Sequence, residues 1–400
     1  MSANIYISAP LVALPNGFSV AFHSSVEDLY AAIPSSFGVP NLFLQAPYLT
    51  ALEENPPEGM RFLFLLFYKN EKIIGLAACQ ILHFKGDKSL NNHENERTAG
   101  FFSAMSYCLK TAVASRVEFD TLICGSLLLT GEHGFWLPGI PVEKAHKIVE
   151  NALVAAQHFL NENSISVTAT LLKDYFQSSP YLVKSGYNEF VIQPNMMMQL
   201  PKEWNNFDDY LLRLHAKART RARRAFKKLD GVVKKNLSLA NLRTEKKRLY
   251  QLYQNIATEA GFNTIYLHPD YLQGLKQHLP EEFQLTGYYL HNQLIAFFST
   301  IKNGDELEAH FLGYDKNLNY DRQLYLNMLY DIIAAGIESR AKCIIFARTA
   351  SEIKSSVGAV AHEMFCYLRH HKPLTNRILG TVFDYLNPVQ PWQPRHPFKD

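Results

Sequence analysis

The sequence has 400 residues, of which 47% are hydrophobic and 19% charged, with a formal net charge of +3. This composition can bury hydrophobic cores, excludes an intrinsically disordered chain, and at this length suggests about two to three domains. No segment approaches the ~20 apolar residues of a membrane helix, and the N-terminus lacks the basic and apolar regions of a signal peptide, so we predict a soluble cytoplasmic protein.

The cysteines are five in number, scattered and free of CxxC spacing. A disulfide framework or a zinc site needs paired, regular spacings, so the sequence predicts neither. We expect buried free thiols in a reducing cytoplasm and no bound metal. The cysteines are Cys79, Cys108, Cys124, Cys343 and Cys366.

The first half of the chain has the pattern strand, turn, strand, strand, helix, strand. Residues 62–81 (FLFLLFYKNEKIIGLAACQI) are two apolar runs around the polar turn KNEK, which is typical of a β-hairpin. An insertion of roughly 35 residues follows, and its polar stretch at 86–98 predicts a mobile loop. After it we predict a strand at 121–129, a helix at 142–160 and a strand at 164–172.

The second half repeats this order. Residues 283–302 (FQLTGYYLHNQLIAFFSTIK) align without gaps with the first hairpin, at a spacing of 221 residues. A predicted strand at 307–314, a helix at 324–340 and a strand at 342–349 follow. This recurrence predicts two copies of one mixed α/β unit, each preceded by helices.

We therefore predict an α/β fold with mixed (α+β) sheets in two tandem domains. The first domain covers residues 1–200 and the second covers 201–385, with the join near Pro201. The Pro-rich segment 386–400 is expected to be extended rather than folded.

Positive charge is concentrated at the start of the second domain. Residues 202–248 hold 15 Lys or Arg against 5 Asp or Glu, a local charge of +10, which leaves −7 for the rest of the chain. Apolar residues recur at helical spacing over 211–229, so most of these cations lie on one helix. A helix face of one sign repels itself unless an anion is near, which points to a nucleotide-linked acceptor, carrier phosphates or tRNA. The alternative is a solvated face that forms ion pairs with the protein's own acidic groups. The candidate anion-binding residues are Lys217, Arg219, Arg221, Arg223 and Arg224.

The order hairpin, strand, helix, strand resembles the central plan of the GNAT acetyltransferase fold. Two such units, the second opened by a basic helix, look like the Fem-type (FemABX-like) peptidyltransferases. Residues 186–204, 210–229 and 312–359 carry the resemblance. It implies a tandem acyl-CoA N-acyltransferase fold that uses acyl-CoA as co-substrate. One departure concerns the CoA pyrophosphate loop: the glycine-rich Q/R-x-x-G-x-G/A pattern is replaced by DKNLNYDRQ in the second half and by GEHGFWLPG in the first.

Candidate catalytic groups lie on the predicted strand 306–311. Alternation places Glu306, Glu308 and His310 on one face. Transfer of an acyl group to an amine requires the amine to lose a proton, which a carboxylate or a histidine can accept. Glu308 and His310 are preferred because they lie nearer the carboxyl end of the strand, where an α/β crevice opens. A solvated edge face is the alternative.

The loop 313–325 leads into the second-half helix, whose N-terminus is a natural seat for phosphate or carboxylate. Tyr314, Tyr320 and Tyr325 could hydrogen-bond a substrate or protonate a leaving thiolate, and Asn327 lies near the same helix start. Packed tyrosines with a solvated hydroxyl are the alternative.

A second polar group follows the buried strand CIIFA. Arg348, Thr349, Glu352 and Lys354 are predicted to point into the crevice and to bind a substrate carboxylate or phosphate. An Arg348–Glu352 ion pair of purely structural role is the alternative. The first half has no such segment in sequence, since its 171–174 stretch is LLKD, so we expect it to be a scaffold.

Three functional hypotheses remain open from the sequence. The first is an N-acyltransferase that moves an acyl group from acyl-CoA to an amine. The second keeps the fold but uses aminoacyl-tRNA as donor and a cell-wall precursor as acceptor. The third is a catalytically silent protein that holds an anionic ligand. The partners are accordingly a small-molecule or nucleotide-linked acceptor and, for the second hypothesis, tRNA.

Overall fold

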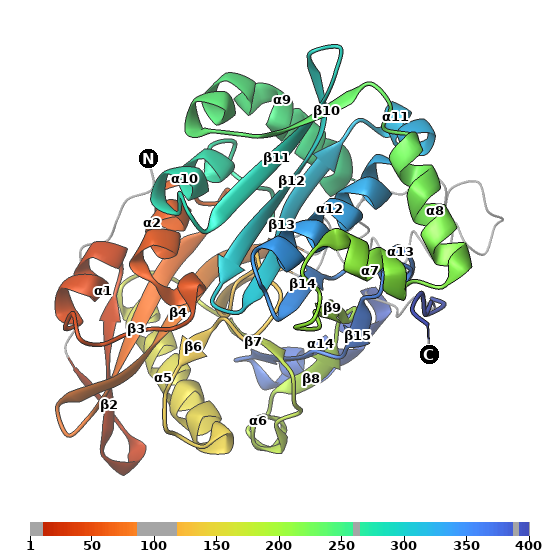
Figure 1. The fold of residues 1–400 in the computed structure, drawn as a ribbon. Helices are drawn as coiled ribbons and strands as arrows, with labels where there is room; N and C mark the ends of the chain where they lie inside the picture. Colours follow the sequence, from red (N-terminus) through yellow and green to blue (C-terminus); the bar gives the residue numbers. More distant parts are fainter. Residues whose placement is uncertain (1–10, 86–117, 259–264, 387–391, 400) are drawn as a thin grey trace, which may run out of the picture. The chain divides into compact units, whose positions relative to one another are not determined.

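The computed structural model describes residues 11–85, 118–258, 265–386 and 392–399 (Figure 1). The insertion at 86–98 and Cys108 lie outside these residues. The chain forms two compact units, each with its own mixed sheet, which confirms the predicted fold class. The first unit comprises residues 1–192, 261–268 and 364–389, and the second comprises 193–260, 269–363 and 390–400.

The first unit is built on a sheet in the order β1-β2-β3-β4-β5-β7-β16-β8, with β6 beside β4. The long helix α5 packs its apolar face on this sheet. The strands are β1 (Val12–Leu14), β2 (Phe18–His23), β3 (Arg61–Lys69), β4 (Lys72–Lys85), β5 (Glu118–Cys124), β6 (Phe135–Trp136), β7 (Ala169–Tyr175), β8 (Asn188–Val191) and β16 (Phe365–His370). The helices are α1 (Val26–Ala32), α2 (Ala46–Glu54), α5 (Val142–Glu162), α6 (Pro180–Lys184) and α14 (Pro373–Leu386).

The second unit has a sheet in the order β10-β11-β12-β13-β14-β9-β15. Helices α9 and α10 contact one part of it, and α12 packs with α8 in its main hydrophobic core. The strands are β9 (Asn195–Gln199), β10 (Val232–Asn236), β11 (Phe283–Leu290), β12 (Gln293–Asn303), β13 (Glu306–Tyr314), β14 (Cys343–Ala347) and β15 (Val360–His362). The helices are α7 (Phe207–Arg213), α8 (Ala216–Lys227), α9 (Leu239–Ala257), α10 (Tyr271–His278), α11 (Lys316–Arg322), α12 (Leu324–Glu338) and α13 (Ser351–Ser355).

The repeated hairpins share their turn geometry. Asn70 and Glu71 join β3 to β4 with φ of 49° and 62°, and His291 and Asn292 join β11 to β12 with the same two values. Two left-handed residues in a row define the tight turn that suits the twist of an antiparallel pair. Each hairpin also has a register shift just before the turn, at Phe67/Tyr68 and Tyr288/Tyr289 respectively. Both features keep the spacing of 221 residues, so the structure confirms the predicted alignment.

The central parallel pairs are repeated as well. In the first unit β5 and β7 end their pairing at Cys124–Leu172, and in the second β13 and β14 end theirs at Glu308–Ile345. Two residues beyond the last pair, the backbone of each second strand is left-handed: φ is 67° at Asp174 after β7 pairs with β5, and 56° at Ala347 after β14 pairs with β13. The two copies therefore end their parallel ladders in the same way.

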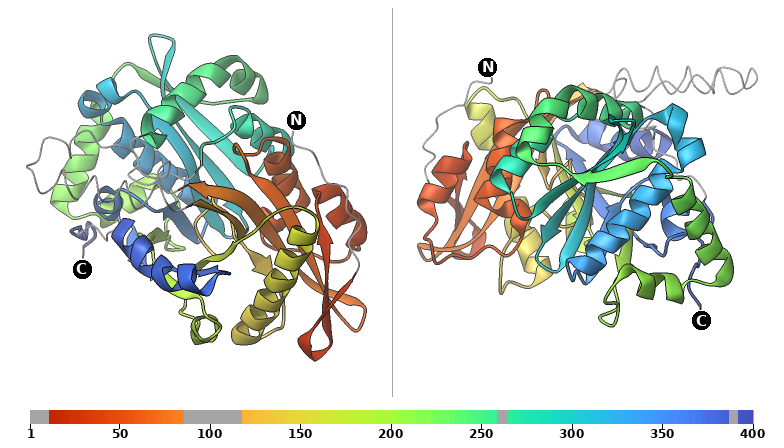
Figure 2. Two further views of the ribbon diagram at one scale, coloured as in Figure 1. Left: turned by 180° about the vertical axis from the view of Figure 1, so that it is seen from behind. Right: turned by 45° about the horizontal axis from the view of Figure 1, so that its top comes forward.

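The two units differ from the predicted domain boundaries at both ends of the second domain. Strand β9 begins before Pro201 and belongs to the second sheet, where Met196 and Met198 enter the core. Strand β16 and helix α14, predicted to lie in the second domain, belong to the first unit, and Figure 2 shows α14 from behind. Since β9 pairs antiparallel to β14 as β16 does to β7, each sheet takes one strand from a distant part of the sequence.

The tail returns to the second unit over residues 392–399. His215 donates its backbone N–H to Pro397 O at 2.9 Å, and Lys399 N–H bonds to Arg213 O at 3.0 Å. Within the described ranges, no helix has the length and apolar character needed to cross a bilayer.

Gly313 marks the place where α9 crosses β13. A Cβ atom at this glycine would lie 2.5 Å from the carbonyl carbon of Leu252 and 2.6 Å from the backbone nitrogen of Tyr253. Helix and strand therefore touch backbone to backbone. The absence of a side chain at this one position holds α9 against the strand that carries Glu308 and His310.

We expect Gly313→Ala to lower the free energy of unfolding by about 2 kcal/mol, because the added methyl group must push two backbones apart. Urea denaturation measures the change. Gly38→Ala is the control, since its Cβ would meet no atom within 4 Å. Equal stability of the two variants would contradict this packing.

Candidate active site

The parallel ladder of the second unit stops in the middle of β13. Its pairs are Glu306–Cys343, Leu307–Ile344 and Glu308–Ile345. Strand β13 continues to Tyr314 but pairs there with β12 alone. Ligands of α/β proteins bind beyond the carboxyl ends of such strands. Glu308, the last residue of the ladder on β13, therefore marks the candidate site.

Two predicted site residues, Glu308 and Lys354, come close together at this point. Their exposed fractions are 3% and 5%. The Lys354 Nζ donates to the carbonyl oxygens of Phe346, Ala347 and Arg348, at 2.6, 3.2 and 2.5 Å. Burial lowers the pKa of Lys354 to about 7, while the Glu308 carboxylate acts in the opposite direction. Three carbonyl acceptors match the three N–H groups of an ammonium ion and favour the charged form.

The backbone held by Lys354 is strained. Ala347, Thr349 and Ala350 have φ of 56°, 67° and 49°, in the left-handed region that residues with a Cβ avoid. Gln193 supports the same loop: its carbonyl oxygen accepts from Arg348 Nε at 2.9 Å, and its Oε1 accepts from Thr349 N–H at 3.2 Å. Strain that the surroundings maintain is characteristic of ligand-binding and catalytic loops.

Glu352 has a different partner from the one considered in the sequence analysis. It forms an ion pair with Arg395 of the C-terminal segment, whose Nε lies 3.1 Å from Glu352 Oε1. Among the residues that the structure describes, no ion pair joins Glu352 to Arg348, so the structural pair considered from the sequence is not supported. Both partners are exposed, so the Glu352–Arg395 pair stabilises the fold only slightly.

A β-bulge interrupts the predicted alternation of β13 at His310. The pairing register between β12 and β13 changes between Phe298 and Thr300. At this point Ser299 Oγ donates to Phe311 O at 2.9 Å and accepts from Phe311 N–H at 3.0 Å. Before the bulge Ala309 packs on the main core, and after it Leu312 does. Because the bulge inserts an extra residue between Ala309 and Leu312, both His310 and Phe311 lie outside this core, and the predicted alternation fails at Phe311.

His310 is placed among aromatic rings. Its Nε2 lies 2.9 Å from the hydroxyl of Tyr271, and its ring centroid is 4.5 Å from that of Phe311. Burial lowers the pKa of His310 to about 3, so the imidazole is neutral at physiological pH. Its Nδ1 is buried and has no hydrogen-bond partner among the residues that the structure describes.

The predicted tyrosines separate into two groups. Tyr314 and Tyr325 lie together at the start of α12, with ring centroids 6.1 Å apart, and burial raises the pKa of Tyr325. Tyr320 is 85% exposed on α11, with Lys228 Nζ 5.6 Å from its ring centroid. Tyr325 therefore has the desolvated surroundings of a candidate proton donor, with Tyr314 beside it.

Asn327 has a structural position. It is 1% exposed, and its Nδ2 donates to the carbonyl oxygens of Ala225, Arg322 and Gln323 at 3.0, 3.2 and 3.0 Å. These bonds fasten the end of α8 to the start of α12. The geometry therefore assigns Asn327 to helix packing, and its buried Oδ1 has no hydrogen-bond partner in the described ranges.

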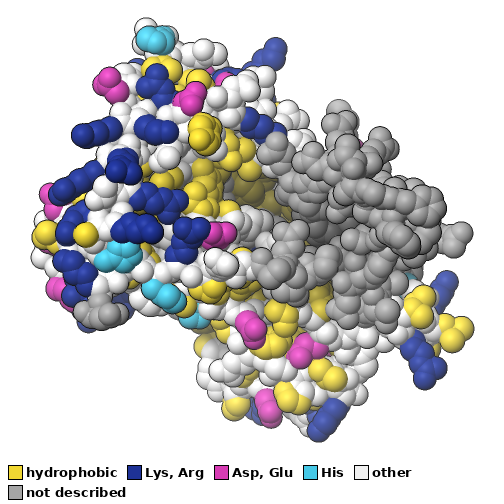
Figure 3. Space-filling model, turned by 90° about the vertical axis from the view of Figure 1, so that its right-hand side faces the viewer, with side chains coloured by type: hydrophobic (Ala, Val, Ile, Leu, Met, Phe, Trp, Pro, Cys, Tyr) yellow, Lys and Arg dark blue, Asp and Glu magenta, His cyan; other side chains and the backbone are white. Residues whose placement is uncertain are grey.

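Helix α8 presents the predicted basic face. Ala222 and Ala225 are buried, and the structure shows no acidic partner, among the residues it describes, for any of the five candidate cations. Figure 3 shows the Lys and Arg side chains that gather on this side of the protein. The alternative of an internally ion-paired face is not supported, so the charge is available to an anion. The five are Lys217, Arg219, Arg221, Arg223 and Arg224.

Sequence reasoning missed Asn195. It is 1% exposed on β9, and within the described part of the chain neither its Oδ1 nor its Nδ2 has a hydrogen-bond partner. Because β9 runs antiparallel to β14, Asn195 lies just beyond the level of Ala347, at the end of the ladder. Each unsatisfied buried polar atom costs about 1–3 kcal/mol. The signal in the sequence is a single amide ahead of an apolar run (NMMM), which by itself does not distinguish Asn195 from a residue at the edge of a core strand.

The first unit fills the corresponding position with its own side chains. Lys173 and Asp174 form a buried ion pair, and Lys173 Nζ also donates to Leu129 O at 2.8 Å. Asp174 Oδ2 accepts from Gly131 N–H at 3.2 Å, and its Oδ1 lies 3.4 Å from Cys366 Sγ. The sequence shows no counterpart of the whole Arg348–Lys354 segment in the first half, but β7 itself supplies a buried lysine just after the last pair of its ladder.

Metal-binding clusters are not found in the described part of the chain, where no group of three or more His, Cys, Asp or Glu is arranged around a common point. The four described cysteines, Cys79, Cys124, Cys343 and Cys366, are free and buried.

Comparison with known proteins identifies the fold. Residues 216–355 match the family model of an acetyltransferase (GNAT) domain. The structure is similar to the crystal structure of FemX, with a TM-score of 0.51 and 11% identity over 89% of this chain and 98% of FemX. A tandem GNAT protein from the clavulanic acid biosynthesis pathway gives a TM-score of 0.48 and 9% identity over 89% of this chain and 99% of that one. A search of curated proteins gave no match.

The chain thus has a GNAT/Fem-like fold, as the sequence resemblance predicted. The matched segment belongs mostly to the second unit and contains α8, Glu308 and Lys354. The family match supports acyl transfer as the general class of reaction.

A pH-dependent contribution to stability follows from the buried imidazole. Between pH 6.5 and about 3 the unfolded chain binds a proton at His310 that the native protein does not. The stability contributed by the neutral imidazole is therefore complete above pH 6.5 and is lost as the pH falls toward about 3.

We expect wild-type protein to lose stability more steeply than His310→Gln between pH 6.5 and 4, by up to about 1.4 kcal/mol per pH unit. Urea unfolding at several pH values measures both slopes. His362→Gln, at an exposed position, serves as control and should keep the wild-type slope. Parallel curves for wild type and His310→Gln would show that His310 titrates normally in the native state.

Proposed function

We propose that the second unit is an N-acyltransferase that moves an acyl group from acyl-CoA to an amine. The observation that carries this proposal is the buried Glu308 carboxylate at the last pair of the β13–β14 ladder, close to Lys354. The amine nitrogen attacks the thioester carbonyl carbon, and the C–S bond breaks. Glu308 accepts the proton that the amine loses, directly or through one water. The CoA thiolate leaves and takes up a proton.

The surrounding residues have positioning roles in this scheme. Lys354 holds the backbone of Phe346–Arg348, and Arg348, Thr349 and Glu352 line the strained loop toward a substrate. The Tyr325 hydroxyl, whose pKa is raised by burial, stays protonated at neutral pH and can supply the proton to the thiolate with Tyr314 beside it. Catalysis would then rest on orientation and electrostatic stabilisation rather than on a covalent intermediate.

Because the chain lacks the glycine-rich loop in both halves, the phosphate groups of acyl-CoA need a different binding site. At the start of α12 the Tyr325 N–H is already bonded to Asn319 Oδ1 at 3.0 Å, and α11 occupies the approach to the helix. Helix α8 is fastened to this region, because Asn327 bonds to Ala225 O and Arg322 Nη1 bonds to Asp230 O at 2.7 Å. We therefore assign the phosphates of the donor to the unpaired cations of α8. Tyr320 is an exposed contact at the edge of the same region.

A cytoplasmic location belongs to this proposal, since the described cysteines are free and acyl-CoA is a cytoplasmic donor.

The first test is Glu308→Gln, which keeps shape and removes the base. We expect its turnover with acetyl-CoA and a panel of primary amines to fall by about 100-fold or more. Glu306→Gln, at the partly exposed start of the strand, is the matched control and should stay within about threefold of wild type. Thermal melts establish that both variants are folded.

Full activity of Glu308→Gln would remove Glu308 from the proposed mechanism. A wild-type protein that binds acetyl-CoA but transfers nothing to any amine would favour the catalytically silent hypothesis.

The unpaired face of α8 also favours a second candidate, an aminoacyl-tRNA-dependent peptidyltransferase that acts on a cell-wall precursor. A polyanion gains more than a small molecule from five cations on one helix, and its binding weakens steeply with salt because counterions are released.

If aminoacyl-tRNA is the donor, replacing Lys217, Arg223 and Arg224 together by Gln should weaken tRNA binding by at least about tenfold. The slope of the logarithm of the binding constant against the logarithm of the salt concentration should also fall, by an amount that corresponds to up to about three released counterions. Filter binding at several salt concentrations measures both. The control removes the same charge from exposed positions elsewhere in the unit, by Lys202, Arg243 and Lys247 to Gln. If wild type binds acetyl-CoA but no tRNA, or if both triple variants lose tRNA equally, the tRNA hypothesis fails.

A further inference from the structure

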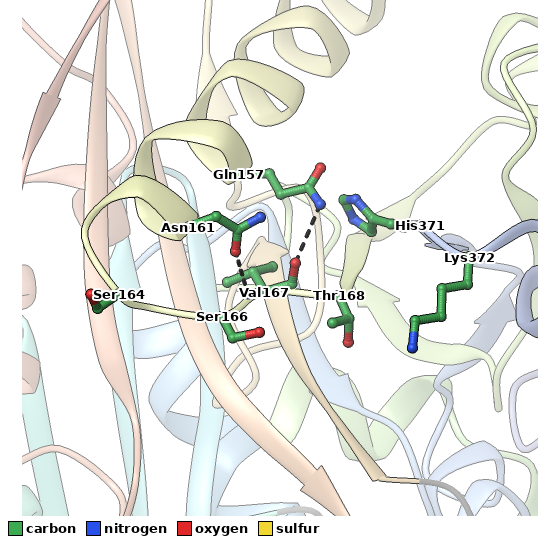
Figure 4. Close-up of a pocket in the computed structure, with 8 residues that line it drawn as sticks. All are labelled: Gln157, Asn161, Ser164, Ser166, Val167, Thr168, His371 and Lys372. Carbon is green, nitrogen blue, oxygen red and sulfur yellow. Dashed lines mark hydrogen bonds between the residues drawn. The ribbon is translucent and has the colours of Figure 1, made fainter.

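A pocket of about 400 Å³ lies in the first unit, away from the end of its parallel ladder. It is lined by the last turns of α5, by the connection from α5 to β7, and by the connection from β16 to α14 (Figure 4). These segments are about 200 residues apart in sequence and are joined by β16–β7 pairing and by a bond of 2.8 Å from His371 N–H to Thr168 O. The volume suits a small metabolite.

The charge of the lining has one sign. Lys372 and His371 are its ionisable residues, and none of the eight lining residues is acidic. Burial, together with the positive charges of the neighbouring Arg369, His370 and His158, lowers the pKa of His371 to about 4. The pocket thus favours an anion, because its lining contains a lysine and no carboxylate.

Polar groups on one side of the pocket are free to bind such an anion. In Figure 4 the hydroxyls of Ser166 and Thr168 and the ammonium group of Lys372 point to the same side. The structure gives none of these three side chains a hydrogen-bond partner among the residues it describes. Two hydroxyl donors and one cation match the oxygens of a phosphate group.

Two amides are held in place next to them. Asn161 Oδ1 accepts from Val167 N–H at 2.9 Å, and Gln157 Nε2 donates to Val167 O at 3.3 Å. Both side chains are therefore fixed by one backbone unit. The Asn161 Nδ2 donor and the Gln157 Oε1 acceptor remain for a ligand, and such a pair suits hydroxyl groups, which donate and accept.

We propose that this pocket binds the phosphate monoester of a small polyol. Lys372, Ser166 and Thr168 hold the phosphate, and Asn161 and Gln157 hold the hydroxyl groups. The site is separate from the proposed acyl-transfer site, which belongs to the second unit, and does not depend on it. It gives the first unit a ligand of its own, in addition to the scaffold role that the sequence suggested.

Isothermal titration of the full chain with glycerol 3-phosphate, inorganic phosphate and glycerol tests the proposal. We expect saturable binding of glycerol 3-phosphate, weaker binding of phosphate and none of glycerol at the same concentration. Lys372→Met should weaken glycerol 3-phosphate binding by about tenfold or more. Thr168→Val is a second variant and should weaken it less.

Lys147→Met is the matched control, because this exposed lysine lies on α5 outside the pocket lining. It should bind like wild type. The proposal is overturned if glycerol 3-phosphate gives no saturable heat at millimolar concentration, if glycerol 3-phosphate binds no better than phosphate, or if Lys372→Met and Lys147→Met have equal affinity. Acyl transfer from acetyl-CoA, which is assigned to the second unit, is measured separately, so failure of that proposal and failure of this one can be told apart.

Discussion

The end of the β13–β14 ladder is the constraint on which the rest of the second unit depends. Where two parallel strands stop pairing, their backbone carbonyls lose partners and must find others. Here the single ammonium group of Lys354 satisfies three of them, from Phe346 to Arg348. This allows the loop to stay left-handed at Ala347, Thr349 and Ala350, and it keeps a counter-charge close to the buried Glu308.

The duplication shows two solutions to that one constraint. Both units end the ladder with a left-handed residue and a buried lysine. In the first, Lys173 comes from β7 and is neutralised by its neighbour Asp174, which also bonds to Gly131 N–H. In the second, Lys354 comes from a separate helix, and the carboxylate near it sits on the other strand of the ladder. A self-contained ion pair suits a structural unit, whereas a carboxylate at the open end of a ladder suits proton transfer. This contrast is the physical argument for an active second unit.

Local patterns made the fold predictable. The two hairpins, α5 and α12 follow from alternation, polar turns and helical spacing, and Glu308 follows from alternation along a short strand. Three features were beyond sequence reasoning because they depend on distant contacts. The exchange of β9 and β16 between sheets leaves no trace in periodicity. The bulge at His310 requires Ser299 on the adjacent strand. The partners of Lys354 and the burial of the Asn195 amide, which has no hydrogen-bond partner among the described residues, appear only once β9, β13 and β14 are assembled.

Hydrogen–deuterium exchange of the full chain, with and without acetyl-CoA, tests the central claim most directly. The proposed site predicts that acetyl-CoA slows exchange in peptides covering 306–314 and 343–356 of the second unit. It predicts no change in the corresponding peptides 118–124 and 169–175 of the first. Protection confined to the first-unit peptides would contradict the assignment of the acyl-transfer site to the second unit.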